Sequence, residues 1–137
     1  MDWKLAVIVV PVADVDRSLA FYRDRVGFRL DVDHRAGNFR VVQLTPPGSA
    51  CSITLMRGPA APGALQGIQL VVNDIDAARQ ALIERGVHAS ELFHFESGLR
   101  TPGHHPERAD YGSFFAFDDP DGNGWVVQEV GRNGATG

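Results

Sequence analysis

The sequence lacks the features that would place it in several large classes of protein. It has one cysteine, Cys51, so it holds neither a disulfide framework nor a Cys-x-x-Cys motif. It has no basic run and a net charge of -4, so nucleic acid is not an expected partner. The longest apolar run, Leu5–Val10, is too short to span a membrane, and residues 1–4 do not form a signal peptide. We therefore expect a cytoplasmic protein that contacts no membrane.

What is present is an ordinary globular composition, with 44% hydrophobic and 22% charged residues in a chain of 137, which fits one domain. The clearest local signal is Asp118–Gly124 (DDPDGNG), which lies between the apolar runs Ser113–Phe117 and Trp125–Val130. Pro, Asp, Asn and Gly are the residues of tight turns, so the segment predicts strand, turn and strand. Its aspartates are expected to serve the turn, because a calcium loop would need further oxygen ligands and a closing Glu.

Hydrophobic periodicity predicts the other elements. Asp14 and Asp74 are predicted N-caps of helices that end at Gly27 and Gly86. Further strands are predicted over Leu5–Val10, Phe28–Arg35, Phe39–Thr45, Cys51–Arg57, Gly67–Val72 and Val87–Phe95. Gly37-Asn38 is a predicted hairpin turn, Gly58–Gly63 a linker, and Glu96–Asp110 a long loop. Alternation along the second strand predicts one face formed by Phe28, Leu30, Val32 and His34.

The chain contains an internal duplication. Val12–Asp16 (VADVD) and Val72–Asp76 (VNDID) match at an offset of 60 residues, and the strands before them match at the same offset. Each half therefore reads βαβββ. We predict an α+β fold made of two tandem βαβββ modules, residues 4–58 and 65–131, within a single domain over 1–131. Their mixed four-stranded sheets are expected to form a cup with the helices on its outer face, and residues 132–137 a flexible tail.

Three stretches resemble the vicinal oxygen chelate superfamily, which includes glyoxalase I, bleomycin-resistance proteins and extradiol dioxygenases. They are VPVADVDRSLAFYRDRVGF at 10–28, LVVNDIDAARQALIERGV at 70–87 and FDDPDGNGWVVQEV at 117–130. The resemblance implies the glyoxalase/bleomycin-resistance fold and, in the enzymes, a divalent metal held by His, Gln or Glu side chains. It also implies a homodimer, since family members often build their cups across a two-fold interface.

The positions that match the family's metal ligands carry unsuitable residues in this chain. They are Val7, Thr54, Gly67 and Val126. Glu129 is an odd number of residues from Val126, so on a regular strand it faces the opposite side. We therefore predict no metal cofactor, while an atypical divalent site remains the alternative.

Alternate residues of the central strands are expected to line the cup and contact a small-molecule ligand. The predicted ligand-binding set is Val7, Val9, His34, Thr54, Met56, Gln69, Phe114, Trp125, Val126 and Gln128. Phe93, Arg100 and Tyr111 are candidates for added stacking surface or a lid, and each has a role in the core as its alternative.

The histidines leave two roles open. His34 is either an ordinary half-buried residue or a cavity-lining residue, and it is the one candidate general acid–base. His104 and His105 are expected to be solvated or part of a lid, and His88 and His94 to share one face of the sixth strand.

Three functions follow from this sequence. The first is a metal-independent protein that binds a hydrophobic or aromatic small molecule, as bleomycin-resistance relatives hold an antibiotic. The second is an enzyme that uses the cup and a histidine without a metal. The third is a metal-dependent lyase, isomerase or dioxygenase, which needs ligands that the matching positions lack. One fold hosts many activities, so the resemblance does not choose among them.

Overall fold

The computed structural model describes residues 1–131, which form two mixed sheets and helices and therefore an α+β fold. The residues group into two compact units. Unit one consists of Met1–Gln66 with Asp119–Asn123, and unit two of Gly67–Asp118 with the residues from Gly124 onwards. That residues 1–131 act as a single domain stays a prediction, and the predicted tail at 132–137 lies outside the described residues.

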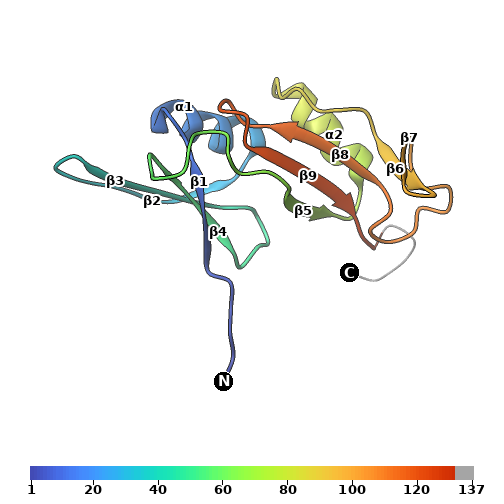
Figure 1. Ribbon diagram of the computed structural model, residues 1–137, viewed down its shortest axis with the longest axis horizontal. Helices are drawn as coiled ribbons and strands as arrows, with labels where there is room; N and C mark the ends of the chain where they lie inside the picture. Colours follow the sequence, from blue (N-terminus) through green and yellow to red (C-terminus); the bar gives the residue numbers. More distant parts are fainter. Residues whose placement is uncertain (132–137) are drawn as a thin grey trace. The chain divides into compact units, whose positions relative to one another are not determined.

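Unit one contains a four-stranded sheet in the order β1-β4-β3-β2, in which β1 and β4 are parallel (Figure 1). Its strands are β1 (Val7–Pro11), β2 (Arg29–Ala36), β3 (Phe39–Thr45) and β4 (Ser52–Met56). Helix α1 (Val15–Ala20) continues into the π-helical segment η1 (Phe21–Val26). The predicted cap is confirmed, because Asp14 accepts a hydrogen bond of 3.1 Å from the Arg17 N–H. Gly27 ends the segment with φ +92°, as its predicted position after the helix requires.

The core of unit one lies on one face of this sheet. Val10, Val42, Leu44 and Leu55 come from three neighbouring strands and have no exposed surface. Tyr22, from η1, is also fully buried. The helical segment therefore contributes to the core, as the spacing of apolar residues along it predicts.

A β-bulge at Asp31 corrects the predicted alternation of the second strand. Leu30 pairs with Leu44, but Val32 pairs with Gln43, so one residue of β2 is left over between them. The Asp31 carboxylate is held by the Thr45 hydroxyl and by Arg29, and these bonds stabilise the extra residue. The predicted common face is therefore wrong: Leu30 pairs with a core residue, whereas Val32 and His34 lie on the opposite face of the sheet.

The turn at 119–123 belongs to unit one although it joins two strands of unit two. The buried Asp119 carboxylate accepts a hydrogen bond of 2.7 Å from the Tyr22 hydroxyl and two of 2.9 Å from the N–H groups of Asp121 and Asn123. The buried Asn123 side chain donates to the Pro11 carbonyl at 2.9 Å. These bonds confirm that the aspartates serve the turn, and they also fix the turn to the helix and to β1.

Unit two contains a five-stranded sheet in the order β5-β9-β8-β6-β7. Its strands are β5 (Ile68–Val72), β6 (Phe93–Glu96), β7 (Leu99–Pro102), β8 (Phe114–Asp118) and β9 (Gly124–Glu129). Strands β8 and β9 form the predicted antiparallel pair, shown in Figure 1. Helix α2 (Ile75–Glu84) begins after the predicted cap Asp74, which accepts from the Ala77 N–H at 3.1 Å.

Two predictions for unit two are wrong. The strand predicted over Val87–Phe95 begins only at Phe93, because Ser90 bonds to Ala116 through both its backbone and its hydroxyl group and interrupts regular pairing. The predicted loop over Glu96–Asp110 contains β7, which adds a fifth strand to the expected four. The turn before it has positive φ at both Ser97 (51°) and Gly98 (79°), as a type I′ hairpin requires.

No helix within residues 1–131 has the length and apolar character needed to cross a membrane.

Candidate functional site

The face of the first sheet opposite its core, here called open face one, carries most of the site residues predicted in unit one. Paired residues of neighbouring strands point to the same side of a sheet. Val9 pairs with Thr54, Thr54 with Gln43, and Gln43 with Val32, which forms a row across all four strands. Val7, Met56 and His34 have the same parity on their strands and extend this face.

Open face one is apolar and partly exposed. The exposed fractions are 41% for Val7, 50% for Val9 and 40% for Val32, whereas Thr54 is buried between its neighbours. His34 is exposed, so of its two predicted positions the half-buried one is excluded. Open face one therefore presents mainly alkyl groups, together with the Gln43 amide on β3 and the His34 imidazole on β2.

The corresponding surface of the second sheet, open face two, combines alkyl, amide and aromatic side chains. Gln69 pairs with Val126, and Gln128 pairs with both Val71 and Phe114. The Gln128 side-chain amide donates to the Gln69 carbonyl oxygen at 3.0 Å. These two amides satisfy each other in part and leave donors and acceptors for a ligand.

An aromatic cluster, formed by Phe93, Phe95 and Phe114, occupies one end of open face two. Phe93 and Phe114 are stacked with ring centroids 5.6 Å apart, and Phe95 lies edge-on to Phe114 at 5.7 Å. Phe93 is buried, but Phe95 is 53% exposed. Phe93 and Phe114 were predicted from the sequence but Phe95 was not, although the alternation of Phe, His and Phe along β6 places both aromatic rings on one side.

Arg100 lies against this cluster. Its guanidinium carbon is 3.7 Å from the centroid of the Phe93 ring, within the range of a cation–π contact. Both side chains line a cavity of about 280 Å³, together with Glu91, Leu92 and Pro102. Arg100 forms no ion pair with any carboxylate of residues 1–131, although Glu91 lines the same cavity.

Trp125 does not share open face two. It pairs with Phe117 and Ile68 on the core side of the sheet, is 2% exposed, and stacks on Phe117 with centroids 6.0 Å apart. Val127, two residues further along β9, faces the same side of the sheet and is also buried. Trp125 is therefore a core residue, and we remove it from the ligand-binding set. Tyr111 is 60% exposed in the loop before β8 and has no contact with the aromatic cluster among the described residues.

The positions that match the family's metal ligands do not fit a metal centre. Val7 and Val126 present alkyl groups, Thr54 a buried hydroxyl, and Gly67 no side chain. Residues 1–131 contain no group of three or more His, Cys, Asp or Glu side chains arranged to hold an ion. Divalent ions in such sites require three or four protein donors, so no catalytic step through a metal follows from these residues.

Glu129 lies on the core side of β9, as its odd spacing from Val126 predicts. Its carboxylate is 1% exposed and accepts hydrogen bonds from the Ile75 N–H at 3.0 Å and from Arg108 at 2.7 and 2.9 Å. Burial alone raises the pKa of Glu129, but the bonds from Arg108 and Ile75 outweigh it and hold the pKa below its ordinary value.

Two of the remaining histidines, His94 and His104, are held by neighbouring groups. His94 is buried and bonded at 2.8 Å to both Glu96 and the Gly103 carbonyl, and these bonds raise its pKa. His104 contacts the Asp76 carboxylate at 2.9 Å and is only partly exposed, so it is not simply solvated. His88 lies outside any strand, so the prediction that it shares a strand face with His94 is wrong.

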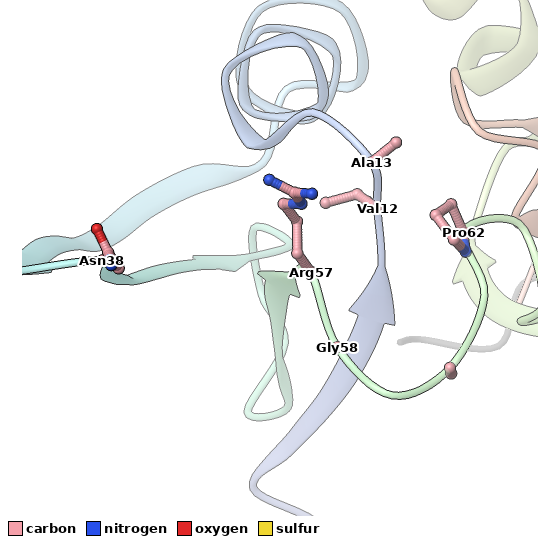
Figure 2. A pocket seen from close by; sticks show the side chains of 7 residues that line it. Val12, Ala13, Asn38, Arg57, Gly58 and Pro62 are labelled. Atoms are coloured by element: carbon pink, nitrogen blue, oxygen red, sulfur yellow. The ribbon is translucent and has the colours of Figure 1, made fainter.

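A larger cavity, of about 490 Å³, lies in unit one (Figure 2). Its lining comes from the β1–α1 connection, the tip of the β2–β3 hairpin and the chain after β4, and consists of Val12, Ala13, Asn38, Arg57, Gly58, Ala60 and Pro62. The sequence predicts Gly58–Gly63 only as a linker. Three connections far apart in the sequence form this cavity, and local periodicity gives no signal for such an arrangement.

Comparison with known proteins decides the family. The model of the glyoxalase/bleomycin resistance protein/dioxygenase superfamily matches residues 4–127. The chain belongs to this superfamily. As the resemblance implied, the fold is the glyoxalase/bleomycin-resistance fold, which its structural neighbours share. No curated protein sequence matches the chain significantly.

Solved structures of this superfamily are similar over nearly the whole chain. TnmS3, an antibiotic binding protein from Streptomyces sp. CB03234, is 30% identical with a TM-score of 0.76, over 94% of this chain and 97% of that one. A glyoxalase/bleomycin resistance protein from the same organism is 32% identical with a TM-score of 0.73, over 92% and 100%. A superfamily member from Sphaerobacter thermophilus DSM 20745 is 29% identical with a TM-score of 0.71, over 93% and 98%.

Proposed function

We propose that the protein binds a small hydrophobic or aromatic molecule, without a metal, on open face two. The aromatic cluster carries this proposal, because a half-exposed Phe95 beside two stacked rings offers a flat apolar surface to a ligand. The Gln69–Gln128 pair supplies the few polar groups that orient a ligand in an apolar site. The antibiotic binding protein TnmS3 supports the same class of function.

A binding role is favoured over catalysis by the chemistry of the side chains. The metal-free enzyme that the sequence suggests would use a histidine as its general acid or base. A histidine lines neither the cavity of about 280 Å³ nor the cavity of about 490 Å³, and His34 lies exposed on open face one. The metal-dependent alternative needs ligands that Val7, Thr54, Gly67 and Val126 do not supply.

Two exposed phenylalanines provide a matched test. Phe95 and Phe39 are each 53% exposed, but Phe39 belongs to unit one and is not part of the aromatic cluster. Binding of 2-naphthol and of its saturated analogue decahydro-2-naphthol is measured by calorimetry, with and without a chelator. We expect 2-naphthol to bind more tightly, Phe95→Ala to weaken it about tenfold, and Phe39→Ala to leave it unchanged.

The proposal fails if both variants weaken binding equally or if neither compound binds. Equal affinity for the saturated analogue would identify a hydrophobic ligand and not a specifically aromatic one. Loss of binding on chelation, restored by a divalent ion, would instead support a metal-dependent function. A cytoplasmic location remains a prediction that this experiment does not address.

We also propose that two copies of the chain form a homodimer through exposed apolar sheet surfaces. Val9 on open face one and Val71 on open face two are 50% and 52% exposed, and exposed apolar surface marks an interaction site where it is contiguous. Sedimentation equilibrium is expected to give twice the monomer mass, and Val71→Glu to weaken association. A monomer at all concentrations would contradict the proposal.

A further inference from the structure

Arg57 is distinguished from other arginines of unit one by the lack of a carboxylate partner. No acidic side chain within residues 1–131 forms an ion pair with it. Other arginines of the unit lie 3.8 Å or less from an aspartate, namely Arg17, Arg23, Arg29, Arg35 and Arg40. Arg57 instead lines the cavity of about 490 Å³. An arginine left unpaired at a concave site is available to an anionic ligand.

The other groups around this cavity are donors or neutral. Its lining contains no acidic residue and includes the Asn38 amide. Gly58 and Ala60, which also line it, have backbone N–H groups with no hydrogen-bond acceptor among the described residues. In Figure 2 the Arg57 side chain rises from the end of β4 beside Val12, between the hairpin tip and the loop. The cavity thus has a local positive charge in a chain whose net charge is -4.

We propose that this cavity binds the anionic oxygen group of a small organic molecule, a carboxylate or a phosphate monoester, through Arg57. The planar guanidinium matches both groups in a two-point contact, and neighbouring N–H donors strengthen it. A volume of about 490 Å³ exceeds that of an inorganic ion and lies in the range of small-molecule sites. None of its lining residues belongs to either open face, so the site does not depend on the function proposed for them.

The test is a titration followed by amide chemical shifts, with benzoate, phenyl phosphate and the neutral benzamide as probes. We expect saturable shifts at Gly58, Ala60 and the Asn38 side chain with at least one of the two anions, and none with benzamide. Saturation by benzoate alone identifies a carboxylate site, and saturation by phenyl phosphate alone a phosphate site. Shifts confined to Phe93 and Arg100 would report the aromatic cluster and not this cavity, and would overturn the proposal.

Two variants that each remove one positive charge complete the design. Arg57→Gln is expected to lower the affinity for the anion about tenfold or more, because a hydrogen bond to a charged group is lost. Arg23→Gln is the control, since Arg23 pairs with the adjacent Asp24 and does not line the cavity. Equal affinity in both variants, or shifts that rise linearly without saturation, would overturn the proposal.

Discussion

Both units place a buried carboxylate at the start of their helix, but they take it from different parts of the chain. In unit one Asp121 accepts from the Ala13 N–H at 3.2 Å, and its side chain is 4% exposed. In unit two Glu129 accepts from the Ile75 N–H at 3.0 Å, and its side chain is 1% exposed. N–H groups at a helix start lack an acceptor within the helix, and Glu129 satisfies one of them in α2. Asp121 instead accepts from the residue just before the cap Asp14, and both carboxylates favour their helix electrostatically.

The two carboxylates differ in how their charge is compensated. Arg17 contacts Asp121 through one nitrogen at 2.9 Å and is 50% exposed. Arg108 holds both oxygens of Glu129, at 2.9 and 2.7 Å, and is only 25% exposed. Both helices of the duplicated sequence therefore begin at an aspartate cap. The ion pairs beside these caps, however, use different residues in the two units. Energetically, unit two depends more strongly on its ion pair.

The largest effect is expected when the ion pair of unit two is broken. Arg108→Met leaves the Glu129 carboxylate buried without its cation and is expected to lower the free energy of unfolding by about 3–5 kcal/mol. Arg17→Met, at the more exposed pair, is expected to cost about 0–1 kcal/mol. Denaturant unfolding of both variants measures the difference. Equal losses would show that the two networks are energetically equivalent.

A substitution at Gly63 is expected to displace the turn that carries Asp121, because the two residues are in close contact. Gly63 has φ +84°, and a Cβ at this position would overlap the backbone oxygen of Asp121. Gly63→Ala is therefore expected to cost roughly 2–4 kcal/mol, from positive φ and from overpacking. Gly48 has the same φ of +84° with no atom near its Cβ, so Gly48→Ala reports the backbone strain alone, about 1–2 kcal/mol. Thermal unfolding that ranks the two variants equally would contradict the clash.

A smaller effect is expected where the same turn contacts the helix. The Tyr22 hydroxyl donates to the buried Asp119 carboxylate at 2.7 Å. Tyr22→Phe retains the buried ring and removes this bond to a charged group, so we expect a loss of about 1–2 kcal/mol in denaturant unfolding. A neutral result would mean that the bonds from Asn123 and the turn backbone hold Asp119 unaided.

The sequence predicted the features that depend on local chemistry. Residues close together in the sequence form the caps at Asp14 and Asp74 and the turn before β9. The motifs that indicate the family are also short and local. The family match then gave the fold, because the motifs occur in a fixed order.

Features that depend on distant partners were missed. The bulge at Asp31 is stabilised by Thr45 from the next strand, and β7 is short and polar, so its pattern resembles a loop. Trp125 was assigned to the ligand site because an aromatic residue on a strand has the same pattern in a core and in a pocket. Arg108 gave no signal, since only the folded loop brings it to Glu129.

The smallest expected effect is a loss of folding stability at low pH. It tests whether folding lowers the pKa of Glu129. Its pKa is lowered on folding, so its contribution to stability is present above the unfolded pKa, about 4.3, and is lost as pH falls through the folded value. Glu129→Gln removes this titration. The difference in unfolding free energy between the native chain and the variant should therefore be constant near neutral pH and shrink in acid. Parallel pH profiles would mean that folding leaves the pKa of Glu129 unchanged, and the distinction drawn between the two ion pairs would fail.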